Sequence, residues 1–171
     1  MVRGHLGETF PAAGGTYVLM LECLCSGTCR VGRFGNLAVS AGRYFYVGSA
    51  LGPGGLRSRL GRHVRPLARR HWHVDFLREL ATVRGVWWLG DGRRLEHVWA
   101  TALARDPRFT APVPGFGASD CHCNAHLFRL LAADVPDVRH LLAAASGADH
   151  RDIGQWCLPA GEAGRHGSER P

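Results

Sequence analysis

The chain has 171 residues, 46% of them hydrophobic and 20% charged, which fits one globular domain and excludes an intrinsically disordered chain. It has no run of about 18 apolar residues, so we expect no membrane span. Its first ten residues lack the apolar core of a secretory signal, so we expect a cytoplasmic protein. The formal net charge of +7 at pH 7 favours a polyanionic partner.

The first third of the chain is expected to be rich in strands. Residues 1–14 contain several glycines and little pattern, and we expect them to be flexible. Residues 16–24 and 43–49 are rich in β-forming residues and predict two strands. Between these strands, turn residues at 26–28 and 35–36 predict an inserted hairpin.

Helices become more frequent in the rest of the chain. Leu56, Leu60 and Val64 recur with helical spacing and predict a helix over about 55–65, which Pro66 ends. The elements expected after it are a short helix over 72–81, a strand over 82–89, a helix over 95–105, a Pro/Gly loop over 109–120, a strand over 126–131 and a helix over 135–145.

The order of these elements predicts the fold class. Strands cluster early and helices follow, which is typical of an α+β domain rather than of alternating βαβ units. We therefore expect one domain over residues 15–145, with a small central antiparallel sheet flanked by helices. Residues 146–171 are expected to form a mobile tail, with Ile153, Trp156 and Leu158 as a local docking patch.

Basic residues are concentrated in one segment. All 21 basic residues are Arg, which a GC-rich genome would explain by itself. Between Arg57 and His73, however, there are six Arg, three His and no acid. Such a basic stripe is typical of a surface that binds a phosphate backbone. The residues expected to bind nucleic acid are Arg57, Arg62, Arg65, Arg69, Arg70 and His73.

Two tripeptides carry the clearest chemical signal. Gly15-Thr16-Tyr17 begins the first strand, Tyr46-Val47-Gly48 ends the second, and Leu56-x-x-Arg59-Leu60-x-x-His63 follows. A strand tyrosine by itself usually packs in the core, and an Arg and a His four residues apart can form a solvated basic face. Together they offer a group that can hold or activate water and a cation for developing charge, which phosphodiester hydrolysis needs.

This combined pattern resembles the GIY-YIG nuclease superfamily, with Thr and Val at the centres of the tripeptides. The resemblance implies a GIY-YIG-like fold and a site that holds one divalent ion, Mg²⁺ or Mn²⁺. By match, Tyr17 and Tyr46 would position or activate the water. Arg59 would stabilise the phosphate in the transition state, and His63 would assist.

The resemblance also requires one metal-binding carboxylate on a later helix. Glu96 is the best candidate, because it is the only acid between Asp91 and Asp106 in an otherwise apolar helix. An exposed Glu in a first helical turn is also common for electrostatic reasons alone. Glu22 and Asp75 are the alternative candidates.

Three longer runs resemble one uncharacterised branch of this superfamily, the domain-of-unknown-function family 123. The runs are residues 44–50, 70–77 and 115–128. Members of this branch occur alone or fused to endonuclease III. The resemblance covers roughly residues 15–145, and it differs from typical GIY-YIG members in the hairpin inserted between the two tripeptides. It implies nuclease activity only by superfamily analogy.

Six Cys, at positions 23, 25, 29, 121, 123 and 157, are expected to be reduced thiols or metal ligands. Cys121, Cys123 and His126 form a C-x-C-x-x-H pattern that is compatible with Zn²⁺. The fourth ligand would have to be His122, Cys157 or a residue of the 71–75 run. Alternatively, Ser119 and Asp120 shape this loop through hydrogen bonds to the backbone.

The function expected from these features is metal-dependent DNA cleavage by an endonuclease that acts in DNA repair or processing. The alternative is a nucleic-acid-binding module that keeps the fold but does not cut. A third hypothesis is a zinc-stapled interaction domain. A nuclease needs the Glu96 carboxylate near Arg59, whereas a binding module does not.

Overall fold

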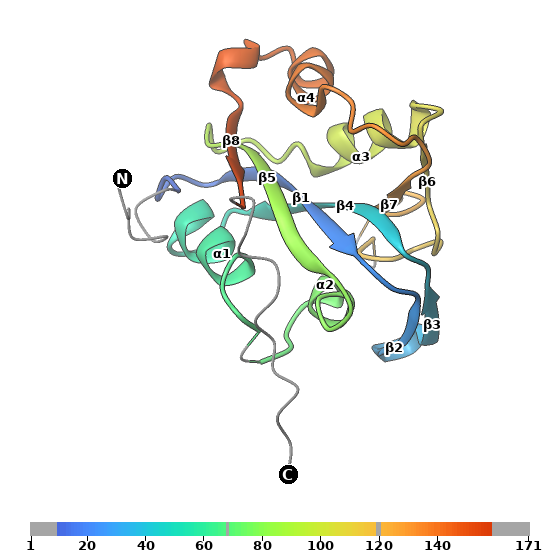
Figure 1. The fold of residues 1–171 in the computed structure, drawn as a ribbon. Helices are drawn as coiled ribbons and strands as arrows, with labels where there is room; N and C mark the ends of the chain where they lie inside the picture. Colours follow the sequence, from blue (N-terminus) through green and yellow to red (C-terminus); the bar gives the residue numbers. More distant parts are fainter. Residues whose placement is uncertain (1–9, 68, 119–120, 159–171) are drawn as a thin grey trace.

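A six-stranded antiparallel sheet forms the centre of the protein (Figure 1). The computed structural model describes residues 10–67, 69–118 and 121–158. The strands lie in the order β6-β7-β4-β1-β5-β8. They are β1 (Gly15–Cys23), β4 (Gly42–Ala50), β5 (Thr82–Leu89), β6 (Phe109–Thr110), β7 (Leu127–Leu130) and β8 (Gly154–Cys157).

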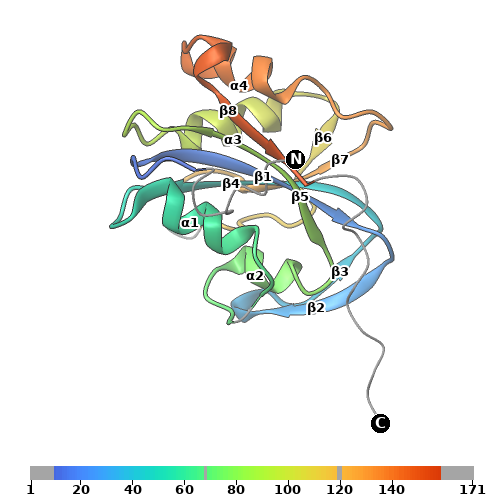
Figure 2. The same ribbon diagram turned by 60° about the vertical axis from the view of Figure 1, so that its left-hand side comes forward.

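A separate two-stranded hairpin is inserted between β1 and β4, as expected. It consists of β2 (Gly27–Val31), a short 3₁₀ turn η1 (Gly32–Phe34) and β3 (Gly35–Val39). In Figure 2 the hairpin lies beside α2 (His73–Leu77), away from the main sheet. The expected α+β class, with a central antiparallel sheet and an inserted hairpin, is confirmed.

Helices cover both faces of the sheet. Figures 1 and 2 show α1 (Gly55–His63) and α2 against one face, and α3 (Glu96–Arg105) and α4 (Val138–Ser146) against the other. No helix in the described ranges is both long and apolar enough to cross a membrane.

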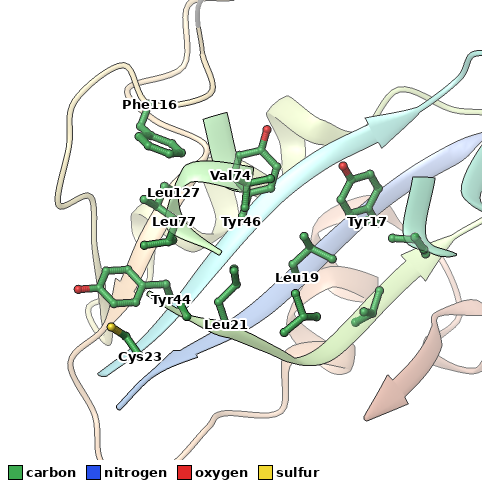
Figure 3. Packing of buried hydrophobic residues seen from close by; sticks show 14 of the residues in the cluster. Tyr17, Leu19, Leu21, Cys23, Tyr44, Tyr46, Val74, Leu77, Phe116 and Leu127 are labelled. Atoms are coloured by element: carbon green, nitrogen blue, oxygen red, sulfur yellow. The ribbon is translucent and has the colours of Figure 1, made fainter. Parts of the chain in front are cut away.

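Alternation along the strands produces two hydrophobic cores, because successive side chains of a strand point to opposite faces. Tyr17, Leu19 and Tyr46 belong to the core under α1 and α2, whereas Val18 and Val47 belong to the core under α3 and α4. Figure 3 shows part of the first core. Burial on both faces explains why β1 is apolar throughout most of its length.

The C-terminal segment corrects an expectation. Residues 146–171 were expected to be mobile, yet residues 150–152 form a 3₁₀ turn and β8 pairs with β5 at the sheet edge. Ile153, which was expected to belong to a local docking patch, does dock, with its side chain 1% exposed within the second core. A four-residue edge strand has too few apolar positions to be recognised from periodicity. Residues 159–171 lie outside the described residues.

The N-terminal expectation also changes. Residues 1–9 lie outside the described residues, but residues 10–14 are held in place rather than loose. Phe10 is 1% exposed, and its ring packs edge-on against Trp88 with the centroids 5.1 Å apart. The backbone N–H groups of Leu56 and Arg57 donate to the carbonyls of Ala13 and Pro11.

Candidate active site

A groove of about 580 Å³ lies where the beginning of β1 meets the end of β4. Tyr17 of β1, Tyr46 of β4, Arg59 of α1 and Glu96 of α3 all line it. Four of the five residues that the superfamily pattern indicates as catalytic or metal-binding are therefore brought to one place. His63, the fifth, lies behind the groove wall.

Strand register places the two tyrosines on one face. Leu19 of β1 is paired with Tyr46, and Tyr17 is paired with Gly48, so Tyr17 and Tyr46 are diagonal neighbours. In Figure 3 both rings stand on the same side of the two strands. A Cβ atom at Gly48 would lie 2.6 Å from the Cζ and Oη atoms of Tyr17. A glycine is needed here because the Tyr17 ring occupies the space of a side chain.

His63 connects Tyr17 to a buried carboxylate. Its side chain is 1% exposed, so Arg59 and His63 do not form a solvated face. Its Nε2 lies 3.0 Å from the Tyr17 hydroxyl, and its Nδ1 lies 3.9 Å from Oδ1 of Asp75. Because Nδ1 faces the carboxylate, we assign the imidazole proton to Nδ1, and Nε2 then accepts a hydrogen bond from Tyr17.

Burial controls the protonation of this pair. It lowers the pKa of His63 to about 3, helped by the charge of Arg78, so the imidazole is neutral at pH 7. Burial, followed by the neighbouring Tyr46, raises the pKa of Tyr17. The Tyr17 hydroxyl is therefore protonated in the resting protein, with its proton directed towards His63.

Asp75 is a structural ion-pair partner, which does not suit it to the alternative role of metal ligand. Its fully buried carboxylate lies 2.7 Å from Nη2 of Arg62 and 3.4 Å from Nη1 of Arg78. It also accepts hydrogen bonds from the backbone N–H groups of His71 and Trp72. Burial would raise the pKa of Asp75, but these donors and Arg62 outweigh it and the pKa is lowered.

Glu22, the other alternative, lies away from the groove. It pairs with Arg43 and Arg84, with shortest distances of 3.7 Å and 3.2 Å. Glu22 lies four positions after Val18 on β1, so the two side chains point to the same face of the sheet, opposite to Tyr17. Among the described residues, Glu96 remains as the only acid that lines the groove.

The Glu96 carboxylate is 9% exposed at the beginning of α3 and lies 3.4 Å from Nη1 of Arg94. Thr16 fixes this helix start. Its hydroxyl accepts a hydrogen bond from the N–H of Leu95 and donates one to the carbonyl of Arg93. The central residue of the first tripeptide thus anchors the segment that carries Glu96, a role that no sequence pattern indicated.

Arg59 carries a charge that is available to a ligand. Its guanidinium lies 3.9 Å from the centroid of the Trp72 ring, a cation–π contact that fixes its position. No carboxylate lies within ion-pair distance of Arg59 in the described ranges. Both features suit a cation that meets phosphate in the groove.

A family model matches residues 16–147, most of the chain, and carries the description Domain of unknown function DUF123. The chain belongs to this family. No curated protein and no solved structure matches it. The DUF123 segment contains every groove residue named above and ends before β8.

A second concavity of the DUF123 segment, about 540 Å³ in volume, collects basic residues around α1 and the loop that follows it. Its lining includes Arg57, Arg62, Arg65, Arg69 and Arg78. In contrast to Arg62 and Arg78, the side chains of Arg57, Arg65 and Arg69 have no carboxylate partner among the described residues.

The two other residues expected to bind nucleic acid lie outside this concavity. Arg70 pairs with Glu79. His73 lines the groove, where its ring contacts Phe34 and Phe116 with centroid distances of 5.6 Å and 5.8 Å. The residues of the expected basic stripe therefore do not share one surface, because four of them line the concavity, His73 lines the groove and Arg70 lines neither.

The side chains of the cysteine and histidine pattern in the DUF123 segment lie close together, and a histidine outside the pattern joins them. Cys121, Cys123 and His126 meet His97 of α3, and their ligand atoms all lie within 4.8 Å of one another. His122 and Cys157, which were considered as fourth ligands, are exposed and are not part of this cluster. The 71–75 run does not contribute either. His97 lies more than twenty residues before Cys121, so local spacing carried no signal for it.

Proposed function

We propose that this DUF123 protein is a divalent-metal-dependent endonuclease of the GIY-YIG type that hydrolyses DNA phosphodiester bonds. The observation that carries the proposal is the convergence of Tyr17, Tyr46, Arg59 and Glu96, from four different elements, on one groove. Structural packing alone would not require an acid, a cation and two hydroxyls to meet there.

Glu96 fits the role of metal ligand. Mg²⁺ is usually held by one or two carboxylates, with water and substrate phosphate completing its octahedron. Within the part of the chain that the structure describes, the groove holds one acid and an Arg without a carboxylate partner, which matches that arrangement. The ion, when bound, would neutralise phosphate charge and lower the pKa of a bound water.

Tyr17 is suited to hold the attacking water rather than to act as a preformed base. Its own proton is directed to Nε2 of His63, so its oxygen lone pairs are free to accept a hydrogen bond from water in the groove. The raised pKa of Tyr17 excludes a standing phenolate at neutral pH. Tyr46 lines the same groove beside it.

Arg59 would meet the charge that develops on the phosphate oxygens. Its place on the Trp72 ring holds the guanidinium in position before substrate binds, and such preorganised cations stabilise a transition state without reorganisation. The DNA backbone would continue from the groove around α1 to the Arg57, Arg65 and Arg69 surface.

The proposal is tested by cleavage of supercoiled, branched and flapped DNA with Mg²⁺ or Mn²⁺. We expect metal-dependent cutting by the wild type, and a loss of roughly 100-fold or more in Glu96→Gln and in Arg59→Ala, because each removes charge stabilisation from the transition state. Glu22→Gln, on the other face of the sheet, and Arg108→Ala, paired with Asp106, serve as matched controls that should retain activity.

The outcomes separate the proposal from its alternative. Cutting that is lost in both groove variants and kept in both controls supports the nuclease. No cutting by the wild type, together with salt-sensitive DNA binding, would overturn it in favour of a nucleic-acid-binding module. Equal cutting by the wild type and Glu96→Gln would contradict the role of Glu96 as the metal ligand.

A further inference from the structure

Four sulfur and nitrogen side chains form a compact cluster outside the groove residues that carry the proposed hydrolysis. His97 comes from the first turn of α3, and Cys121, Cys123 and His126 come from the loop before β7. We refer to these four residues as the Cys₂His₂ cluster. We propose that the cluster binds one Zn²⁺ ion in a structural site.

The spacing within the cluster fits a tetrahedral ion. Nδ1 of His97 lies 3.2 Å from Sγ of Cys123, and Nε2 of His126 lies 3.4 Å from Sγ of Cys121. Zinc bonds of about 2.3 Å to sulfur and about 2.0 Å to nitrogen give tetrahedral S···N edges of about 3.5 Å. Each thiol therefore lies about one tetrahedral edge from an imidazole.

The donor set selects the class of metal. Two thiolates and two imidazoles are borderline-soft ligands that favour Zn²⁺, whereas Mg²⁺ and Mn²⁺ prefer oxygen. All four positions of a tetrahedron would be filled by protein, which is typical of a structural rather than a catalytic ion. The Cys₂His₂ cluster and Glu96 would thus bind different metals.

The location gives such an ion a mechanical role. His97 follows Glu96 directly on α3, and His126 lines the groove together with Gly117 of the preceding loop. The backbone N–H of Val47 donates to the carbonyl of His126, which ties the loop to β4 next to Gly48. An ion in the Cys₂His₂ cluster would therefore clamp the loop onto α3 and fix one wall of the groove.

Hydrogen bonding offers the competing explanation. A thiol and an imidazole at 3.2–3.4 Å can share a proton without any metal. This explanation accounts for each pair alone, but it gives no reason for both pairs to lie within one 4.8 Å cluster drawn from two segments.

The test is the metal content of the untagged full-length chain. After incubation with Zn²⁺ and gel filtration, we expect one zinc per chain by elemental mass spectrometry. Cys123→Ser and His97→Ala should lose it, whereas His122→Ala, in the same loop, and Cys157→Ser, on β8, should keep it. Zinc that is absent from the wild type, or kept in both cluster variants, overturns the proposal.

A spectroscopic measurement on the wild type covers the case in which the cluster variants fail to fold. X-ray absorption at the zinc edge should show two sulfur and two nitrogen neighbours, and Co²⁺ substitution should give the absorption of a tetrahedral thiolate complex. A shell of oxygen and nitrogen only would overturn the proposal. Glu96→Gln should retain the zinc, so a failure of the zinc proposal and a failure of the nuclease proposal remain distinguishable.

Discussion

Three neighbouring side chains influence one another's protonation, in the order Asp75, His63 and Tyr17. Asp75 keeps its negative charge because Arg62 and two backbone N–H groups compensate its burial. His63 is buried without comparable compensation, since among the described residues its Nδ1 faces only the Asp75 oxygen 3.9 Å away, and it remains neutral. Because the unprotonated Nε2 of the neutral imidazole accepts a hydrogen bond from Tyr17, the Tyr17 proton points away from the groove.

The lowered pKa of His63 predicts acid sensitivity. Between about pH 6.5 and pH 3, the unfolded chain binds a proton at this position that the native state rejects, so the free energy of unfolding falls as the pH drops. The slope from this group alone is at most about 1.4 kcal/mol per pH unit. Because the pKa of Asp75 is lowered from 3.8, its contribution is lost only below that pH.

Replacement of His63 isolates its contribution. In His63→Gln, we expect the free energy of unfolding, measured in urea between pH 7 and pH 4, to decrease less steeply than in the wild type. His140→Gln, an exposed histidine of α4, should follow the wild-type slope. Parallel curves for His63→Gln and the wild type would show that His63 is protonated in the native state.

At the scale of elements, the proposed site depends on how helices enter the sheet. β7 accompanies β4 only from Tyr44 to Tyr46, and the next three residues of β4 line the groove. Thr16 holds the beginning of α3 against β1 through two hydrogen bonds. Glu96 thereby reaches the groove from a helix whose apolar side packs in the second core.

Ile153, which directly precedes the edge strand β8, yields a prediction about stability. Ile153→Ala should lower the free energy of unfolding by about 3 kcal/mol, because it leaves a cavity beneath α4 in the second core. Leu24→Ala removes the same number of carbons as Ile153→Ala, but from a side chain that is 78% exposed. It should change the free energy of unfolding by less than about 0.5 kcal/mol. Urea unfolding monitored by Trp fluorescence would measure both, and a small effect at Ile153 would restore the expectation of a mobile tail.

At the scale of the whole molecule, the arginines behind the net charge of +7 differ in whether a carboxylate lies next to them. Several arginines are paired locally, as Arg108 is with Asp106 and Arg151 is with Asp149. Arg65 and Arg69, in contrast, line a concave surface without carboxylate partners among the described residues. Unpaired cations on one surface attract a polyanion, whereas paired ones contribute little.

This distribution predicts which arginines contribute to DNA binding. For the double variant Arg65→Ala/Arg69→Ala, the slope of log K against log salt should become shallower by about 2, since about 0.9 is lost per phosphate contact. The paired control Arg108→Ala/Arg151→Ala should leave the slope unchanged. Fluorescence anisotropy over a salt series gives both slopes, and equal changes in the two variants would mean that net charge alone attracts the DNA.

The sequence by itself determined the features that depend on local order. Strand alternation separates Tyr44 and Tyr46 from Phe45 and Val47, and the helical spacing of Leu56 and Leu60 defines the buried side of α1. The central sheet and its inserted hairpin followed from these patterns, whereas the residues of the groove were indicated by the resemblance to the GIY-YIG superfamily. They are local because a side chain's direction depends on the backbone dihedrals of its own segment.

Only the tertiary structure decided the contacts between distant segments. The hydrogen bond from Leu95 to Thr16 spans 79 positions, and His97 meets Cys123 across 26. Asp75 is a buried ion-pair partner because α1 brings Arg62 to it, and residues 154–157 form a strand because they pair with the edge of β5. The energies of such contacts come from burial and pairing that the folded chain creates, so no spacing along the sequence records them.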